Sequence, residues 1–346
     1  MDIQAKGIKA EPSLTGSTRT IEDYVMNIVK NLKNLEYSSL LDVHETLQKM
    51  KTSMKSKHEL NYWKVLQCLG EMSVDYFVRT LILNEKASCK CHTYSNLFCL
   101  MQLFVQLQVN VAVIKRQLTY KGQLIPVFFK ALRQKEDPSL VREGLIGMYR
   151  LLIVGRGELV EIYMNNRILM DFQAQIKCRF SSVGIHSLHA VAYCSELMYV
   201  MAVHGTPKTR RIIKNSPALR VLKDYCTKLK KEIKDHELPD MYKILDNHES
   251  IIGVVTDEYE AEEMAETWKP KVILKEELEN GFEFAKDLIF CSSPACRKQY
   301  TEGVDKQFRY CGACRLSRYC SEACQKEHWR KSHKTSCLQN PQEEPL

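Results

Sequence analysis

Residues 311–337 read CGACRLSRYCSEACQKEHWRKSHKTSC and hold five cysteines and two histidines. Together with Cys291 and Cys296, they bring seven of the 14 cysteines of this 346-residue chain into its last 56 residues. The amino-terminal 20 residues contain no apolar stretch of signal-peptide length, so we expect an intracellular protein, in the nucleus, the cytoplasm or both. In a reducing compartment, clustered cysteines are more often metal ligands than disulfides.

The spacing of these residues predicts two metal sites. Cys311 and Cys314 are separated by two residues, which suits a tight turn that directs two thiolates at one ion. The Cys-x3-Cys pair at 320–324 and the His-x3-Cys pair at 333–337 place both donors on one face of a helical turn. The candidate ligands are Cys291, Cys296, Cys311, Cys314, Cys320, Cys324, His328, His333 and Cys337. Eight donors fill two tetrahedral sites, so one candidate is spare, and spacing alone leaves open which donors share an ion.

A metal is also needed because this segment has too little apolar surface to fold alone. The large apolar residues between the first and last of these cysteines are Val304, Phe308, Leu316, Trp329 and three tyrosines. Structural zinc contributes about 10 to 16 kcal/mol per site in finger peptides at neutral pH. Because the protein supplies enough donors to close both sites, we expect two structural Zn²⁺ ions and no catalytic one.

The pattern C-x4-C-x14-C-x2-C-x5-C-x3-C-Q-x3-W-x3-H-K-x2-C resembles the MYND-type zinc finger over its whole length, 291–337. The resemblance implies that the two ions are bound by alternating ligand pairs. One would take Cys291, Cys296, Cys320 and Cys324, and the other Cys311, Cys314, His333 and Cys337. His328 would then be the spare candidate. The first pair departs from the family, because four residues separate Cys291 from Cys296 where two are usual.

The resemblance also implies a binding role. MYND-type fingers bind proline-containing peptides, and the residues at the matching positions of this chain would do the same. The resemblance implies a strand edge for peptide addition at Leu316, Ser317, Arg318 and Tyr319, with Gln325 as a polar clasp and Trp329 as an apolar wall. For Trp329, packing within the small finger core is an equally good interpretation.

The rest of the chain predicts an all-α body. Glycine (14) and proline (10) are sparse, and Asp137-Pro138 has the pattern of a helix start. A shift of 50 residues superposes Gly155, Ile162, Asn165 and Leu169 on Gly205, Ile212, Asn215 and Leu219. A weaker copy at a shift of 44 superposes Leu118 on Ile162 and Ile125 on Leu169. Periods in the forties are typical of stacked helical units, and the pattern resembles armadillo repeats, with an irregular helical bundle as the alternative.

These patterns divide the chain into five parts. We expect a flexible amino terminus at 1–19, an armadillo-like helical body at 20–250, an acidic linker at 251–290, the MYND-type finger at 291–337 and a tail at 338–346. Within the linker, residues 257–287 hold 11 acidic residues against four lysines, so their charge is 4 − 11 = −7. The most apolar run, which begins at Leu97, carries several Gln and Asn residues and predicts a buried helix rather than a membrane span.

The function that these features favour is a non-enzymatic adaptor. The finger would recruit proline-containing segments of partner proteins, in a corepressor-type assembly or in chaperone or ubiquitin machinery, and the body would hold a second client. The alternatives are a nucleic-acid-associated transcription regulator and, less well supported, a methyltransferase-like enzyme. Two zinc ions and seven thiolates add +4 − 7 = −3 to the +6 of the finger's other charges, and the resulting charge near +3 is modest for nucleic-acid binding.

Overall fold

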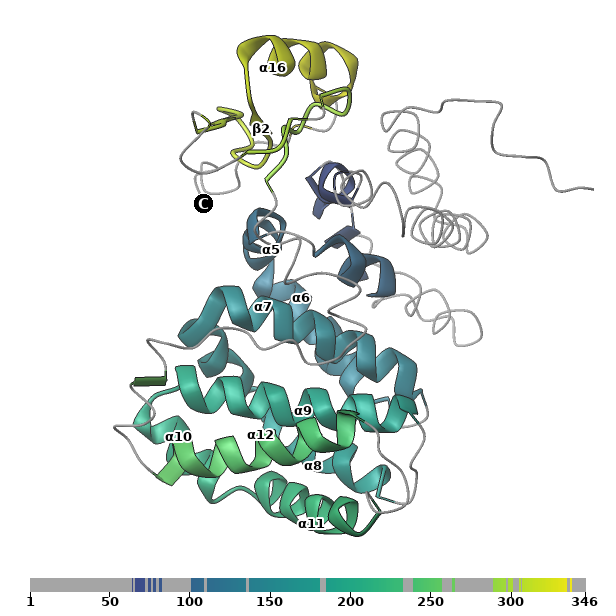
Figure 1. Cartoon of the computed structure of the whole chain (residues 1–346), viewed down its shortest axis with the longest axis vertical. Helices are drawn as coiled ribbons and strands as arrows, with labels where there is room; N and C mark the ends of the chain where they lie inside the picture. The colour runs from purple at the N-terminus through teal and green to yellow at the C-terminus, as the bar shows by residue number, and fades with distance from the viewer. Residues whose placement is uncertain are drawn as a thin grey trace, which may run out of the picture.

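The chain forms a helical body and a small carboxy-terminal finger (Figure 1). The computed structural model describes residues 64, 66–71, 74–75, 77–78, 81–82, 101–108, 111–134, 137–180, 185–232, 239–256, 263–264, 289–296, 298–300, 305, 307–334 and 337. The predicted amino terminus and tail, and most of the predicted acidic linker, lie outside this set. Among the helices that the set contains, none combines the length and hydropathy of a membrane span.

The named helices of the body follow one another with short connections. They are α5 (Val111–Leu118), α6 (Lys121–Leu132), α7 (Pro138–Asn165), α8 (Ile168–Cys178), α9 (Ile185–His204), α10 (Pro207–Lys214), α11 (Pro217–Glu232) and α12 (Pro239–Thr256). The finger contains β1 (Arg309–Tyr310), β2 (Arg318–Tyr319), α16 (Glu322–His328) and a π-helical turn at Trp329–His333. Helix α12 thus continues six residues past position 250, where the sequence predicts the end of the body.

Two sequence features explain where α7 begins and bends. The Asp137 side chain accepts a hydrogen bond from the Leu140 N–H at 2.9 Å, and Pro138 occupies the first turn, which confirms the predicted helix start. At Arg156 the backbone is non-helical, with φ 44° and ψ −129°, next to Gly155. Two helical segments therefore meet at this kink, and the glycine-containing stretch around Gly155 is the turn between them.

The repeat found in the sequence is matched by the burial of its helices. Buried positions of α8 fall 50 residues before buried positions of α11: Ile168, Leu169, Phe172, Gln175 and Ile176 correspond to Ala218, Leu219, Leu222, Tyr225 and Cys226. A shift of 44 relates the buried Leu124, Ile125, Phe128, Ala131 and Leu132 of α6 to the same residues of α8. The three helices therefore turn the same face toward the core.

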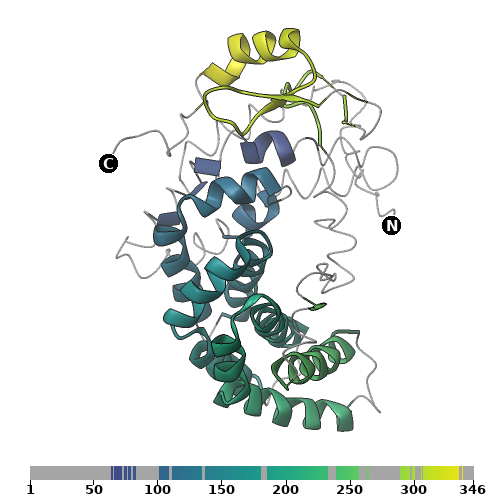
Figure 2. The same ribbon diagram turned by 90° about the vertical axis from the view of Figure 1, so that its left-hand side faces the viewer.

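The repeated helices stack in layers. Helix α9 packs between α7 and α12, and α8 packs against α11, so that one apolar core runs through the body. Figure 2 shows the stack as a curved array, with the finger beyond α5 and with α11 and α12 at the opposite end. Buried polar groups also join the layers, because Lys243 of α12 forms an ion pair with the buried Glu196 of α9 at 3.3 Å. Glu196, and the buried His189 on the same helix, thus belong to the body core.

The finger is packed against the body. Leu316 of the finger lies in an apolar cluster with Val74 and Val113 of the body, and Phe290, at the start of the finger, is part of the main core. The residues that approach the finger come from 64–82 and from α5, far from it in sequence. The finger and the body are therefore joined by packing as well as by the chain that connects them.

Candidate metal centre

Eight side chains of the finger converge in two separate clusters. The first contains Cys291, Cys296, Cys320 and Cys324, and the second contains Cys311, Cys314, His333 and Cys337. In each cluster the four donor atoms lie within 4.8 Å of one another. Neighbouring sulfur atoms are 3.6 Å apart for Cys296–Cys320 and Cys320–Cys324, and 3.8 Å apart for Cys311–Cys337. In the second cluster, the Cys314 Sγ lies 3.6 Å from the His333 Nε2.

These distances fit tetrahedral zinc and exclude disulfides. Zinc–sulfur bonds of about 2.3 Å at the tetrahedral angle place two sulfurs about 3.8 Å apart. A disulfide would bring them to about 2.05 Å, and the eleven described cysteines are all free. The donor sets, four thiolates in one cluster and three thiolates with one imidazole in the other, are those of closed structural sites. Two structural zinc ions therefore fit this finger, with the alternating ligand pairs that the sequence resemblance implies.

Local structure aims the donors of the second half of the finger. A turn containing Cys311 and Cys314 joins β1 to β2, and Arg315 closes it in the left-handed region at φ 52°. Ser321 caps α16 by accepting a hydrogen bond from the Cys324 N–H at 3.2 Å, which fixes the turn that carries this ligand. The π-helical turn then presents His333.

The loop between Cys291 and Cys296 is largely buried and bonds to strand β2. Ser292 and Ser293 are each 1% exposed. The Ser292 N–H donates to the Arg318 carbonyl at 2.6 Å, and the Arg318 N–H donates to the Ser292 Oγ at 2.7 Å. The longer spacing thus lets Ser292 pair with β2 while both cysteines reach one cluster, and Cys291 lies among the four donors of that cluster.

A lysine from the body organises the same loop. The Lys64 side chain is 2% exposed, and its Nζ donates hydrogen bonds to the carbonyls of Cys291 at 2.7 Å and Ser293 at 3.0 Å, and to that of Cys296. One turn further along the chain, the Gln67 amide donates to the Phe290 carbonyl at 3.0 Å and accepts from the Phe290 N–H at 3.2 Å. These bonds satisfy the carbonyls that the metal-binding loop turns away from the ion.

Each cluster also has a cation of the body beside it. A Zn²⁺ ion with four thiolates carries 2 − 4 = −2 charges, and one with three thiolates and a neutral imidazole carries 2 − 3 = −1. Lys64 lies against the first cluster through the carbonyls described above. Arg116 faces the second: burial opposes its charge, but the hydrogen bond with Asp75 raises the pKa of Arg116, and Cys314 acts in the same direction. Lys64 therefore complements the charge of the first metal centre, whereas the Arg116–Asp75 ion pair lies beside the second.

His328 lies apart from both clusters, as the resemblance implies. Its ring is buried, and its Nδ1 lies 3.1 Å from the Tyr319 hydroxyl. Burial, with smaller contributions from the charges of His333 and Lys64, lowers the pKa of His328 to about 3. The ring therefore stays neutral at physiological pH and supports Tyr319 in the small finger core.

The residues predicted to bind a peptide fall into two groups. Leu316, Ser317 and Tyr319 are 6%, 1% and 1% exposed, respectively, and the backbone of Arg318 is paired with Ser292. This stretch is thus occupied by contacts within the chain. Trp329 is 39% exposed, and Gln325, one turn earlier on α16, is half-buried, so this face of the finger is open. Trp329 also packs edge-on against His333, with ring centroids 5.8 Å apart. It therefore contributes to the finger core and still offers an exposed apolar surface.

Sequence reasoning did not find the body residues that hold the metal-binding loop. Lys64, Gln67, Cys68 and Glu71 follow helical spacing and make one face of a buried helix, but each is an ordinary residue in isolation. Burial raises the pKa of Glu71 to about 7, although hydrogen bonds from Ser292 and Gln67 and nearby cations oppose this shift. A polar stripe on an otherwise apolar helix is the one signal that could have indicated a polar contact here.

Comparison with known proteins identifies the finger. The family model described as MYND finger matches residues 290–337, which is 48 of the 346 residues. MYND fingers are zinc-binding modules for protein–protein interaction. No curated protein and no solved structure matches the chain.

Replacing one ligand in each cluster should remove one zinc ion at a time. We expect native mass spectrometry of the whole chain to show two zinc ions, and one each in Cys324→Ser and Cys314→Ser, because three donors hold structural zinc far more weakly than four. Cys178→Ser, at an exposed cysteine outside both clusters, is the matched control and should keep two. Two zinc ions retained in a ligand variant would contradict the assignment.

Removing the amine of Lys64 should weaken the first cluster selectively. In Lys64→Met the three loop carbonyls lose a charged donor in a buried site, which costs about 1 to 3 kcal/mol. We expect release of one of the two zinc ions to a chelator to become about tenfold faster or more, measured with a colorimetric zinc indicator. Lys208→Met, at an exposed position of α10, should release both ions at the original rates. Equal acceleration of both ions would show that Lys64 acts on the fold in general.

Proposed function

We propose that this protein is a non-enzymatic adaptor whose finger recruits a proline-containing segment of a partner protein and whose helical body holds a second client. The observation that carries the proposal is the closed coordination of both clusters. Each offers four protein donors, which leaves no coordination position for a substrate. The ions then serve to hold a surface in shape, and the chemistry they supply is structural. The same reasoning supports a protein without catalytic activity at the finger.

The open face at Gln325 and Trp329 is the proposed peptide site. The two residues are four apart, on consecutive turns of the helical segment, so their side chains lie on the same face. An exposed indole offers the flat apolar wall on which proline rings pack, and the adjacent amide can bond to the backbone of an extended peptide. Leu316, Ser317, Arg318 and Tyr319 then support this face from within, in place of a free strand edge.

For the body, we propose an armadillo-like arrangement. It is supported by the 50-residue shift that relates buried positions of α8 and α11, and by the packing of α9 between α7 and α12. A pocket of about 640 Å³ between the ends of neighbouring units is the proposed client site. Its lining includes Met170 and Ile212, which are 61% and 45% exposed and are flanked by Arg167 and Arg211. Because the two exposed apolar side chains line the same pocket, they form a shared apolar surface that a client could cover.

The partner classes remain those that the finger resemblance implies, a corepressor-type assembly or chaperone or ubiquitin machinery, with the protein in the nucleus, the cytoplasm or both. Point variants are the right tool for separating finger partners from body partners. Removing the whole finger would leave the buried Lys64 amine without the three carbonyls it binds. It would also expose Val74 and Val113 of the body, on which Leu316 packs.

Substituting Gln325 and Trp329 should abolish peptide capture by the finger. We expect the Gln325→Ala/Trp329→Ala variant to bind a fluorescent proline-containing probe peptide at least about tenfold more weakly, because an aromatic anchor and its hydrogen-bonding neighbour are lost. Fluorescence anisotropy measures the affinity, and native mass spectrometry should still show two zinc ions.

The matched control is Arg330→Ala, which truncates the exposed residue next to the tryptophan. It should bind the probe with nearly unchanged affinity. Undiminished capture by the double variant, with both zinc ions in place, would reject this face as the peptide site.

A further inference from the structure

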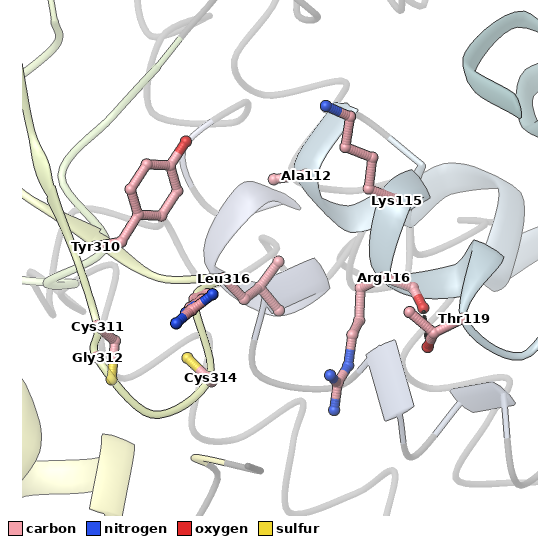
Figure 3. Close-up of a pocket in the computed structure, with 10 residues that line it drawn as sticks. Ala112, Lys115, Arg116, Thr119, Tyr310, Cys311, Gly312, Cys314 and Leu316 are labelled. Atoms are coloured by element: carbon pink, nitrogen blue, oxygen red, sulfur yellow. Dashed lines mark hydrogen bonds between the residues drawn. The ribbon is translucent and has the colours of Figure 1, made fainter. Parts of the chain in front are cut away.

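A second pocket lies where the finger meets the body, away from the Gln325 and Trp329 face. It has a volume of about 560 Å³ and is lined by α5 on one side and by the β1–β2 turn on the other. Figure 3 shows Lys115 of α5 and Tyr310 of β1 on opposite sides of the opening, with Leu316 between them. Neither Gln325 nor Trp329 is among its lining residues.

The floor of this pocket is apolar and fixed in place. Leu316 is 6% exposed and packs on Val74 and Val113, the same contact that holds the finger on the body. Ala112 extends the apolar surface along α5. Because these contacts are made already, the pocket is formed before any ligand arrives, and an apolar side chain could bury itself there at little conformational cost.

The pocket exposes two cations beside the second metal cluster, whose Cys311 and Cys314 also line it and whose charge with Zn²⁺ is −1. Lys115 and Arg315 are exposed among the lining residues, and none of the described residues that line it is acidic. Arg116 also contributes to the lining, but it forms a bidentate ion pair with Asp75 at 2.8 and 3.0 Å, so its charge is balanced within the body. Lys115 and Arg315 are thus the exposed cations at this pocket.

A strand edge runs beside the pocket. Strands β1 and β2 are antiparallel, and the Cys311 N–H donates to the Ser317 carbonyl at 2.8 Å. Bonded and non-bonded pairs alternate along such a ladder, so Tyr310 and Arg318 form a non-bonded pair whose backbone groups point outward. Arg318 uses its outward groups on Ser292, whereas no described residue bonds to those of Tyr310. Within the described part of the chain nothing pairs with this edge, so one more extended strand could add to it.

We propose that the pocket binds an extended acidic segment of a partner protein. Its backbone would pair with Tyr310, an apolar side chain would enter the space above Leu316, and flanking carboxylates would approach Lys115 and Arg315. The backbone edge and the apolar floor favour a peptide over nucleic acid, which would need a longer track of cations. Because the pocket joins α5 to the finger, this surface exists only in the assembled chain and adds a second specificity to the finger.

The test uses the whole zinc-loaded chain and two pools of capped nonapeptides with otherwise random positions. One pool has glutamate fixed at alternate positions, and the other has lysine at those positions. We expect enrichment of glutamate-pool peptides that contain an apolar residue, and slower hydrogen exchange of the Tyr310 amide when they bind. No enrichment over the lysine pool, unchanged exchange at Tyr310, or displacement of the peptides by a short DNA duplex would each overturn the proposal.

Charge reversal supplies the matched comparison. Lys115→Glu/Arg315→Glu should bind the selected acidic peptides about tenfold more weakly and gain affinity for the lysine pool. Lys208→Glu/Lys214→Glu on α10 changes the net charge equally, at exposed positions outside the pocket, and should leave binding unchanged. Both variants should retain two zinc ions. If both variants lost affinity for the acidic peptides equally, the effect would come from the net charge of the protein and not from the pocket. Trp329→Ala should bind the acidic peptides normally, which separates this surface from the proposed proline-peptide face.

Discussion

The hydrogen bonds of one buried amine hold the metal-binding loop and the body together. A chain segment wrapped around a metal ion turns its carbonyls outward, and in a buried contact every such carbonyl needs a donor. Lys64 supplies three of these bonds from a site that is 2% exposed, beside a cluster whose four thiolates leave excess negative charge. The loop carbonyls and the thiolate cluster surround this amine with negative potential. Finger geometry and body packing are consequently parts of one cooperative unit.

The packing of the finger on the body also decides which edges of the β1–β2 hairpin are covered. Ser292 pairs with the outward backbone of Arg318, which closes one edge of the two-stranded sheet, and Leu316 reaches across to the body on the adjacent face. What stays accessible is the opposite edge at Tyr310 and the helical face around Trp329, which is 39% exposed. The surfaces proposed for partners are thus those that docking on the body leaves open.

The sequence predicted the local features well because their causes are local. Ligand spacing, the Asp137 helix start and the 50-residue periodicity each depend on residues within one turn or one unit, and the eight donors lie in the two clusters that the resemblance implies. The docking of the finger was not predictable in the same way. Lys64 and Cys291 are 227 residues apart, and a single lysine on a helix gives no sign of its partner. The resemblance also implies that the backbone of Arg318 pairs with an incoming peptide. In the structure Ser292 of the longer first loop bonds to that backbone, a contact that the family pattern does not contain.

The longer first loop has a consequence for how this domain can be exchanged. Because metal binding supplies much of its folding free energy, a small zinc finger can be moved to another chain when its fold needs no contact from its neighbour. Here Ser292, Ser293 and Pro294, three of the four residues between Cys291 and Cys296, are buried, and the Ser293 carbonyl accepts a hydrogen bond from Lys64 of the body. A finger with a shorter first loop would bring its own metal ligands but would have to present different carbonyls to the buried Lys64, so we expect the loop and the helix that carries this lysine to be exchangeable only together.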